Sequence, residues 1–289
     1  MFYHDGGKLQ YHVRVDKPNP HFAKMLQQAI GGIEGEIRVC LQYLFQSWGC
    51  RGPAKYRDML LETGTEEMAH IEMLATAVAL NLEGAPTETK SNMAMHPIVG
   101  AVLGGMNPRH VLSAGLAAMA ADANGMPFNG SWVVASGNLA ADMYANVMAE
   151  ATGRVLATRL YEMTDDHGMK DMLAFLIARD TMHQNQWLAV IEDLGGLEQV
   201  LPIPNSFPQS MENRDFNYSF VSTRKEAEVN PDERWTNGPS IDRHGTFRFE
   251  PAVPLGDKPK LAALEPDSHS QLEQQPGAPG APNTSGVRL

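Results

Sequence analysis

The chain has 289 residues, enough for one large domain or two small ones with an ample hydrophobic core. Its formal net charge of −11 argues against binding to nucleic acids or anionic membranes. The longest weakly polar run, residues 97–106, is too short to span a bilayer, and the polar first twenty residues predict no signal peptide. The only cysteines, Cys40 and Cys50, fit a reduced, cytoplasmic protein.

In chain order, residues 1–20 are predicted to form an N-terminal arm. The arm has a strand-like alternation of apolar side chains, at Leu9, Tyr11, Val13 and Val15. A first helix is predicted over residues 22–48, and a second runs from Pro53, a favourable first helical residue, to about residue 82. Because the connection is short, these two helices should be antiparallel neighbours.

A long crossover containing several prolines follows over residues 83–131, and its middle, residues 108–121, is predicted to be helical. Two further helices are predicted over residues 137–163 and 169–194, with a turn between them. Two helical hairpins joined by one long crossover predict an all-α, ferritin-like four-helix bundle spanning residues 21–200.

Residues 201–289 lose the helical periodicity and should form an extended, irregular C-terminal tail. The tip, residues 268–289, is rich in proline and glycine and is expected to be disordered. The preceding part carries too many aromatic residues for a solvated tail, so we expect it to pack on its own subunit or on a neighbour. These aromatic residues are Phe207, Phe216, Tyr218, Phe220, Trp235 and Phe247.

One pattern occurs twice: a glutamate followed about thirty residues later by an acid-x-x-His pair. The two copies are Glu36 with Glu67 and His70, and Glu150 with Asp180 and His183. Positions i and i+3 lie on one face of a helix, and an antiparallel neighbour brings the earlier glutamate level with that pair. Two facing hairpins would thus place four carboxylates and two imidazoles around one cavity. Such an arrangement is typical of a bridged pair of transition-metal ions in a bundle core.

The pattern lies on apolar helix faces, where buried acids need a partner or a metal ion. The two inward lines are Thr63, Glu67, His70, Leu74 and Ala77, and Leu176, Asp180, His183 and Trp187. Two nearby acids are interpreted as non-ligands. Glu66 could share the face of His70, but the second copy has Arg179 at that position, and Glu34 lies on a different face from Glu36.

Four stretches of the chain resemble the manganese catalases, namely residues 8–11, 31–36, 63–70 and 136–143. The resemblance covers about residues 1–200 and extends more loosely into the tail. It implies two manganese ions per subunit, with Glu67 as the bridging carboxylate. The implied ligands are Glu36, Glu67, His70, Glu150 and His183. It also implies a homohexamer whose C-terminal segments embrace adjacent subunits, which would account for the aromatic tail.

The symmetry of the two copies makes Asp180 a sixth ligand, whereas the resemblance makes it a proton acceptor beside the metals. We follow the resemblance, because peroxide binding requires an open, solvent-filled metal position. The family often has glutamate at this position, and part of it has a basic residue where this chain has Ala149. Arg154, one turn beyond Glu150, could supply that charge or could simply be solvated.

Tyr43, two turns from Glu36 on the same face, could hydrogen-bond a ligand carboxylate or merely line the core. In part of the family a calcium ion joins a helix to the tail of a neighbouring subunit. The matching oxygen-bearing residues here are Asp58, Glu62, Asn217 and Ser219. An ordinary charged helix face is the alternative interpretation of the two acids.

The expected reaction is disproportionation of hydrogen peroxide to water and dioxygen, with the metal pair cycling between Mn(II)₂ and Mn(III)₂. Carboxylates and imidazoles suit manganese and iron alike, so a di-iron oxidase or ferroxidase remains an alternative. A non-enzymatic coat relative of the catalases is a second alternative, but it would predict a degraded ligand set. All five implied ligands are present.

Overall fold

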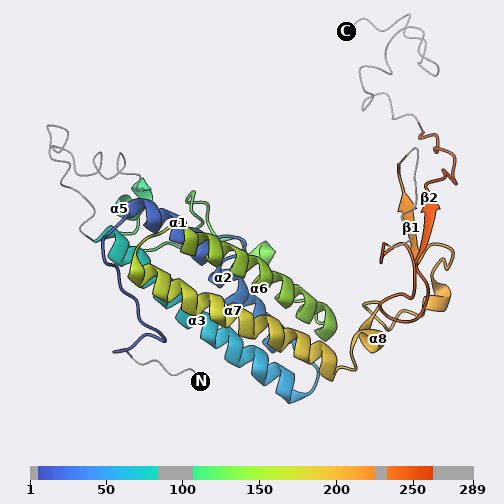
Figure 1. Cartoon of the computed structure of the whole chain (residues 1–289), viewed down its shortest axis with the longest axis horizontal. Coiled ribbons are helices and arrows are strands. Elements are labelled where there is room, and N and C mark those ends of the chain that lie inside the picture. Colours follow the sequence, from blue (N-terminus) through green and yellow to red (C-terminus); the bar gives the residue numbers. More distant parts are fainter. Residues whose placement is uncertain (1–5, 84–106, 225–232, 263–289) are drawn as a thin grey trace, which may run out of the picture. The chain divides into compact units, whose positions relative to one another are not determined.

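The computed structural model describes residues 6–83, 107–224 and 233–262. Long helices run side by side in a bundle (Figure 1). Their bounds are Pro20–Gly31 (α1), Glu36–Gly49 (α2), Ala54–Leu82 (α3), Leu139–Glu162 (α6) and His167–Asp193 (α7). The helix pairs α2–α3 and α6–α7 pack closely along their lengths. The two hairpins and the long crossover confirm the predicted ferritin-like bundle.

The prediction of one continuous helix over residues 22–48 is wrong, because the chain breaks between α1 and α2 at a glycine-rich turn. Gly32 follows the last residue of α1 and Gly35 precedes α2, both in extended conformation. A Cβ atom at Gly31 would lie 2.5 Å from the backbone of Ala121, so the crossover passes too close for any side chain there. The break makes Glu36 the first residue of α2, where the partial positive charge of the helix N-terminus favours a carboxylate.

The second hairpin begins close to the predicted positions. Asn138 caps α6 by accepting a hydrogen bond from the amide of Ala141, and Asp166 caps α7 by accepting one from Met169. Capping by Asp166 starts α7 at His167, inside the turn predicted before residue 169.

In the crossover, the helix predicted over residues 108–121 is much shorter than expected. It comprises only Pro108–Leu112 (α5), followed by turns and a short 3₁₀ helix, Gly130–Trp132 (η1). The helix stops because Gly115 and Leu116 both take positive φ angles, 58° and 66°, which right-handed helices exclude. Residues 84–106, which include the weakly polar run 97–106, lie outside the described residues.

The N-terminal arm alternates as predicted but forms no strand within its described residues, 6–19. Its apolar side chains are partly buried against the bundle, and the ring of Tyr11 stacks on Phe175 of α7 at a centroid distance of 4.5 Å. Alternation without a neighbouring strand leaves the arm extended along the helices.

The bundle core has a polar layer between two apolar clusters. Along α3, Leu60 belongs to one cluster and Leu74 to the other, and Glu67 and His70 lie between them. Along α7 the order is reversed, from Leu176 through Asp180 and His183 to Trp187. Every residue of the two predicted inward lines is buried, which confirms them. The acids and histidines of the pattern are therefore enclosed by apolar packing on both sides.

The C-terminal region contains short elements that the sequence did not predict. These are Leu197–Val200 (α8), Gln209–Met211 (η2) and two parallel strands, Ser219–Ser222 (β1) and Arg248–Pro251 (β2), in register from Ser219 opposite Arg248. The chain divides into two compact units. One lies within Met1–Asn217 and Pro239–Thr246, and the other, which holds both strands, lies within Tyr218–Gly238 and Phe247–Leu289.

The predicted disordered tip, residues 268–289, lies outside the described residues. Several aromatic side chains of the tail are exposed in the single chain, among them Phe207, Phe216, Phe220 and Trp235. No helix in the described part of the chain is long and apolar enough to cross a membrane.

Candidate metal centre

The residues of the repeated pattern come together in the polar layer from four helices. Glu36 begins α2, Glu67 and His70 lie on α3, Glu150 lies on α6, and Asp180 and His183 lie on α7. All are buried except Glu36, whose side chain is 15% exposed.

Two groups of side chains could each hold a metal ion. In the first, Nδ1 of His70 lies 2.6 Å from Glu67 Oε2 and 3.8 Å from Glu36 Oε2. In the second, Nδ1 of His183 lies 3.0 Å from Glu67 Oε1 and 3.4 Å from Glu150 Oε1. Within each group, one ligand atom from each residue lies within 4.8 Å of the others. Glu67 belongs to both groups and turns one carboxylate oxygen toward each.

The crowding of acids in this layer perturbs their protonation. Burial, and then the charge of Glu67, raises the pKa of Glu36 to about 7. Burial also raises the pKa of Glu150. For Glu67, burial favours the protonated form, but the adjacent imidazoles of His70 and His183 outweigh it and lower the pKa of Glu67 to about 2.

The two imidazoles are perturbed in the opposite direction. Burial alone would lower the pKa of His70 and of His183. The surrounding carboxylates outweigh it, raising the pKa of His70 well above its usual value and that of His183 to about 12. The anionic site therefore draws positive charge inward, which protons supply here and divalent cations can supply in their place.

Orphaned polar atoms show that the residues fit a metal ion. Glu67 Oε1 and His183 Nδ1 are both buried without a hydrogen-bond partner among the described residues, although they lie only 3.0 Å apart. His70 Nε2 is a third such atom. A cation between Glu67 Oε1 and His183 Nδ1 would satisfy both lone pairs. The donor set of carboxylate oxygens and imidazole nitrogens suits a divalent first-row transition metal.

Asp180 is buried in the same layer but belongs to neither group. Burial, followed by the charges of Glu36, Glu150 and Glu67, raises its pKa to about 9. The Asp180 carboxyl group is thus influenced by the charges of the acids in the centre without belonging to either candidate metal group.

Arg154 is neither a free, solvated side chain nor bonded to a pattern residue in the described structure. Its guanidinium donates to the carbonyl of Ile177 and, at 2.8 Å, to Thr181 Oγ1, both on α7. Ala149, where part of the family has a basic residue, is buried. A role for Arg154 in the chemistry stays a prediction.

Tyr43 is fully buried, and its hydroxyl donates a hydrogen bond to Glu150 Oε1, the contact expected with a ligand carboxylate. Its ring packs on Trp187 at a centroid distance of 4.8 Å. Burial and the neighbouring acids raise the pKa of the Tyr43 hydroxyl well above its usual value, so it remains a donor. Whether Tyr43 affects turnover stays a prediction.

A buried polar column, not recognised in the sequence, continues from Glu150 along α6. Asn146, one turn earlier, accepts hydrogen bonds at Oδ1 from Gln42 at 2.8 Å and Gln46 at 2.9 Å, and donates one to Gln46 at 2.7 Å. All three amide side chains are buried. Their four-residue spacing on each helix was visible in the sequence, but only the packing of α2 on α6 shows that they meet.

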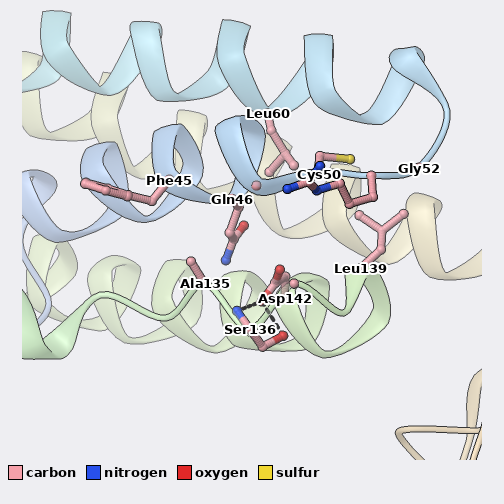
Figure 2. Close-up of a pocket in the computed structure, with 12 residues that line it drawn as sticks. Phe45, Gln46, Cys50, Gly52, Leu60, Ala135, Ser136, Leu139 and Asp142 are labelled. Carbon is pink, nitrogen blue, oxygen red and sulfur yellow. Dashed lines mark hydrogen bonds between the residues drawn. The ribbon is translucent and has the colours of Figure 1, made fainter.

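The column ends at a pocket between the end of α2, the start of α3 and the segment leading into α6. Figure 2 shows Gln46 and Asp142 lining this pocket. Asp142 accepts hydrogen bonds at 2.8 Å from both the amide and the hydroxyl of Ser136. No residue of either candidate metal group lines the pocket, which lies outside the centre.

The four predicted calcium-binding residues lie in two separate compact units, Ser219 in one and the other three residues in the other. Asp58 and Glu62 are exposed one turn apart on α3, and Asp58 is paired with Arg57. The Asn217 amide donates to Glu212, and the Ser219 hydroxyl donates to Glu250. Calcium binding by these residues stays a prediction.

Of the two acids interpreted as non-ligands, Glu34 lies in the turn before α2 and accepts a hydrogen bond from Gln28. Glu66 belongs to neither metal group, but it is in contact with the centre. Its carboxylate lies 3.2 Å from Nε2 of His183 and pairs with Arg179. Burial alone would raise the pKa of Glu66, but the adjacent histidines, Arg179 and Gln10 stabilise its charged form and hold the pKa well below its usual range. Excluding Glu66 by comparison of the two copies missed these contacts.

Comparison with known proteins bears on this centre. Residues 1–283 match the family described as manganese-containing catalase. A manganese catalase of Bacillus subtilis is 46% identical over 264 residues, covering 91% of this chain and 96% of that protein. A manganese catalase of Lactiplantibacillus plantarum is 44% identical over 194 residues, covering 67% and 72%. The crystal structure of a manganese catalase from Anabaena superposes with a TM-score of 0.68 at 22% identity, covering 86% of this chain and 99% of that one, a likeness of fold.

Proposed function

Because this chain belongs to the manganese catalase family, we propose that its two Glu–His groups hold two manganese ions per subunit. The chain is a manganese catalase, and its substrate is hydrogen peroxide. The observation that carries the assignment of the ligands is the position of Glu67, whose two carboxylate oxygens face different histidines. A single buried carboxylate placed in this way is suited to bridge two ions.

We assign Glu36 and His70 as further ligands of one ion, and Glu150 and His183 as further ligands of the other. Bound manganese supplies the reversible two-electron oxidation and reduction that peroxide disproportionation requires. The hydrogen bond from Tyr43 to Glu150 holds one ligand carboxylate in place. The apolar clusters on either side of the polar layer limit access of bulk water to the site.

Asp180 is proposed as the group that stores a proton between the two halves of the reaction. Two peroxide molecules give two water molecules and one dioxygen. The peroxide that is oxidised releases two electrons and two protons, and the peroxide that is reduced takes them up. A carboxyl group near the metals but outside both groups can accept a proton in one half and return it in the other. Its exclusion from both groups supports this role over that of a sixth ligand.

A di-iron oxidase or ferroxidase would use the same kinds of ligand, but the family match and the identity to curated manganese catalases favour the catalase. A structural relative without activity would not be expected to keep a buried, complete donor set. The test is elemental analysis of the purified protein together with oxygen evolution from peroxide. We expect close to two manganese ions per chain and oxygen release. Stoichiometric iron without oxygen evolution would contradict the proposal.

We further propose that the chain assembles as a homohexamer and that each tail covers a neighbouring subunit. The exposed aromatic side chains of the tail, Phe207, Phe216, Phe220 and Trp235, support this, since aromatic residues are enriched at protein interfaces relative to the rest of the surface. A calcium ion bound by Asp58 and Glu62 with Asn217 and Ser219 of a neighbour would fit the same assembly. The compartment proposed is the cytoplasm, where thiols such as those of Cys40 and Cys50 stay reduced.

A further inference from the structure

One carboxylate outside the two metal groups lies against the outer nitrogens of both histidines. Glu66 Oε2 forms a hydrogen bond with His183 Nε2 at 3.2 Å. Glu66 Oε1 lies 3.6 Å from His70 Nε2, a buried atom without a hydrogen-bond partner among the described residues, and offers it an acceptor. The other ring nitrogen of each histidine, Nδ1, faces Glu67. We propose that Glu66 is a positioning residue that holds both imidazoles with Nδ1 directed at the manganese ions. This inference rests on the proposed function of the centre.

The chemistry of a metal-binding imidazole explains why such a carboxylate is needed. The nitrogen that binds the metal must offer a lone pair, so the ring proton must be on the other nitrogen. A carboxylate that accepts this proton in a hydrogen bond fixes the tautomer, orients the ring and makes the ligand nitrogen more basic. The rings of His70 and His183 are nearly parallel, with 26° between their planes and 6.1 Å between centroids. Glu66 Oε2 accepts from the His183 ring, and Oε1 faces the His70 ring at a separation that a small shift on metal binding would close to a hydrogen bond.

Glu66 is itself held in place by two side chains from other parts of the chain. Arg179 on α7 donates from Nε to Oε1 at 2.6 Å and from its terminal nitrogen to Oε2 at 3.2 Å. Gln10 in the N-terminal arm donates to Oε1 at 2.9 Å. The two hydrogen bonds from Arg179 fix the plane of the carboxylate, and the N-terminal arm adds a third hydrogen bond through Gln10. The side chain of Glu66 is 21% exposed, so these contacts lie at the edge of the polar layer.

The two copies of the sequence pattern differ at the position where they meet. Glu66 immediately precedes Glu67 in the first copy, and Arg179 immediately precedes Asp180 in the second. The facing hairpins bring these equivalent positions into an ion pair. One copy thus supplies the acceptor for both histidines, and the other supplies the cation that orients it. A glutamate at both positions would set two carboxylates against each other.

A competing interpretation is that the Glu66–Arg179 pair merely ties α3 to α7. If the ion pair only links the two helices, its loss would change the thermal stability of the metal-free protein but would leave the affinity of the folded protein for manganese unchanged. A positioning residue would change the manganese affinity of the folded protein. The two interpretations therefore differ in a measurement that does not depend on turnover.

The experiment compares Glu66→Gln with Glu72→Gln, which makes the same change on the exposed face of the same helix. Glu66→Gln keeps the size of the side chain but removes the charge and replaces one acceptor oxygen with a donor group. The dissociation constant for Mn(II) is measured on full-length protein stripped of metal, at a temperature where circular dichroism shows each variant folded. We expect affinity about 10–100-fold weaker for Glu66→Gln and parent affinity for Glu72→Gln. Parent affinity in Glu66→Gln, with or without a lower unfolding temperature, would overturn the proposal.

Arg179→Lys provides the decisive test if Glu66→Gln does not fold. Lysine keeps the charge but cannot grip both oxygens of Glu66, so manganese affinity should fall by at least about threefold. Parent affinity in this variant would equally overturn the positioning role. The parent protein separates this inference from the function on which it rests. If the parent binds no manganese, the proposed function fails. If the parent binds manganese and the variants bind it with the same affinity, only the role of Glu66 is refuted.

Discussion

Replacing Asp180 with asparagine separates a proton-transfer group from a metal ligand. Asparagine has nearly the same shape and carries no charge, so the buried position should accept it without unfolding the bundle. Because Asp180 belongs to neither metal group, both manganese ions should remain bound. The amide cannot take up the proton that the carboxylate accepts, and general acid–base groups contribute about a hundredfold or more to rate. A hundredfold loss corresponds to about 2.7 kcal/mol of transition-state stabilisation.

The assay measures manganese per chain by elemental analysis and then kcat for oxygen release on the same sample. Asp171→Asn is the matched control, since it makes the same substitution at an exposed position of α7 and keeps an oxygen that can accept the Tyr11 hydroxyl, so both values should be unchanged. Loss of one manganese ion in Asp180→Asn would identify Asp180 as a ligand. Retention of both ions with full turnover would refute its role in proton transfer.

Three further predictions concern the buried column, the cysteines and the tail. Asn146→Leu should lower the free energy of unfolding of the metal-free protein by about 2–4 kcal/mol in chemical denaturation, because two buried glutamine groups lose their partners. Asn185→Ala on an exposed helix face should cost under about 1 kcal/mol. Equal effects would refute a stabilising role for the buried column. Burial, then the charges of nearby acids, raises the pKa of Cys40 to about 12. Iodoacetamide at pH 8 should therefore label Cys50 and spare the buried Cys40 in native protein. Rapid labelling of Cys40, measured by mass spectrometry, would contradict this. Truncation after Pro202 removes the exposed aromatic side chains of the tail and should break the proposed hexamer or lower its unfolding temperature. A truncated protein that is hexameric and as heat-resistant as the parent would disprove the tail contact.

The sequence predicted the centre better than it predicted the helix ends. Spacing alone placed Glu67 and His70 on one buried face of α3 and placed His183 on the facing side of α7, as observed. Such prediction succeeds because the i, i+3 relation is a property of any α-helix and because buried acids on an apolar face need a cation. Membership of Glu67 in both groups, implied by the family resemblance, depends on how the hairpins pack.

Features that depend on long-range contacts were not predictable in this way. The sequence contains the glycines of the turn between α1 and α2, but it does not show the close approach of Ala121, about ninety residues away, that excludes a side chain at Gly31. The parallel strands β1 and β2 are four residues each and pair across a long interval of the tail, so no local alternation signalled them. Glu66 was set aside because the second copy lacks an equivalent acid, yet Arg179 at that position is its partner. Comparison of repeats detects what the copies share, whereas this contact requires that they differ.

The central claim is that two manganese ions share Glu67 in the polar layer of the bundle. Anomalous diffraction at the manganese absorption edge, from crystals of the purified protein, tests it most directly. We predict two anomalous peaks per chain, one beside Glu36 and His70 and the other beside Glu150 and His183, with Glu67 between them. A single peak, or two peaks that do not both contact Glu67, would contradict the account.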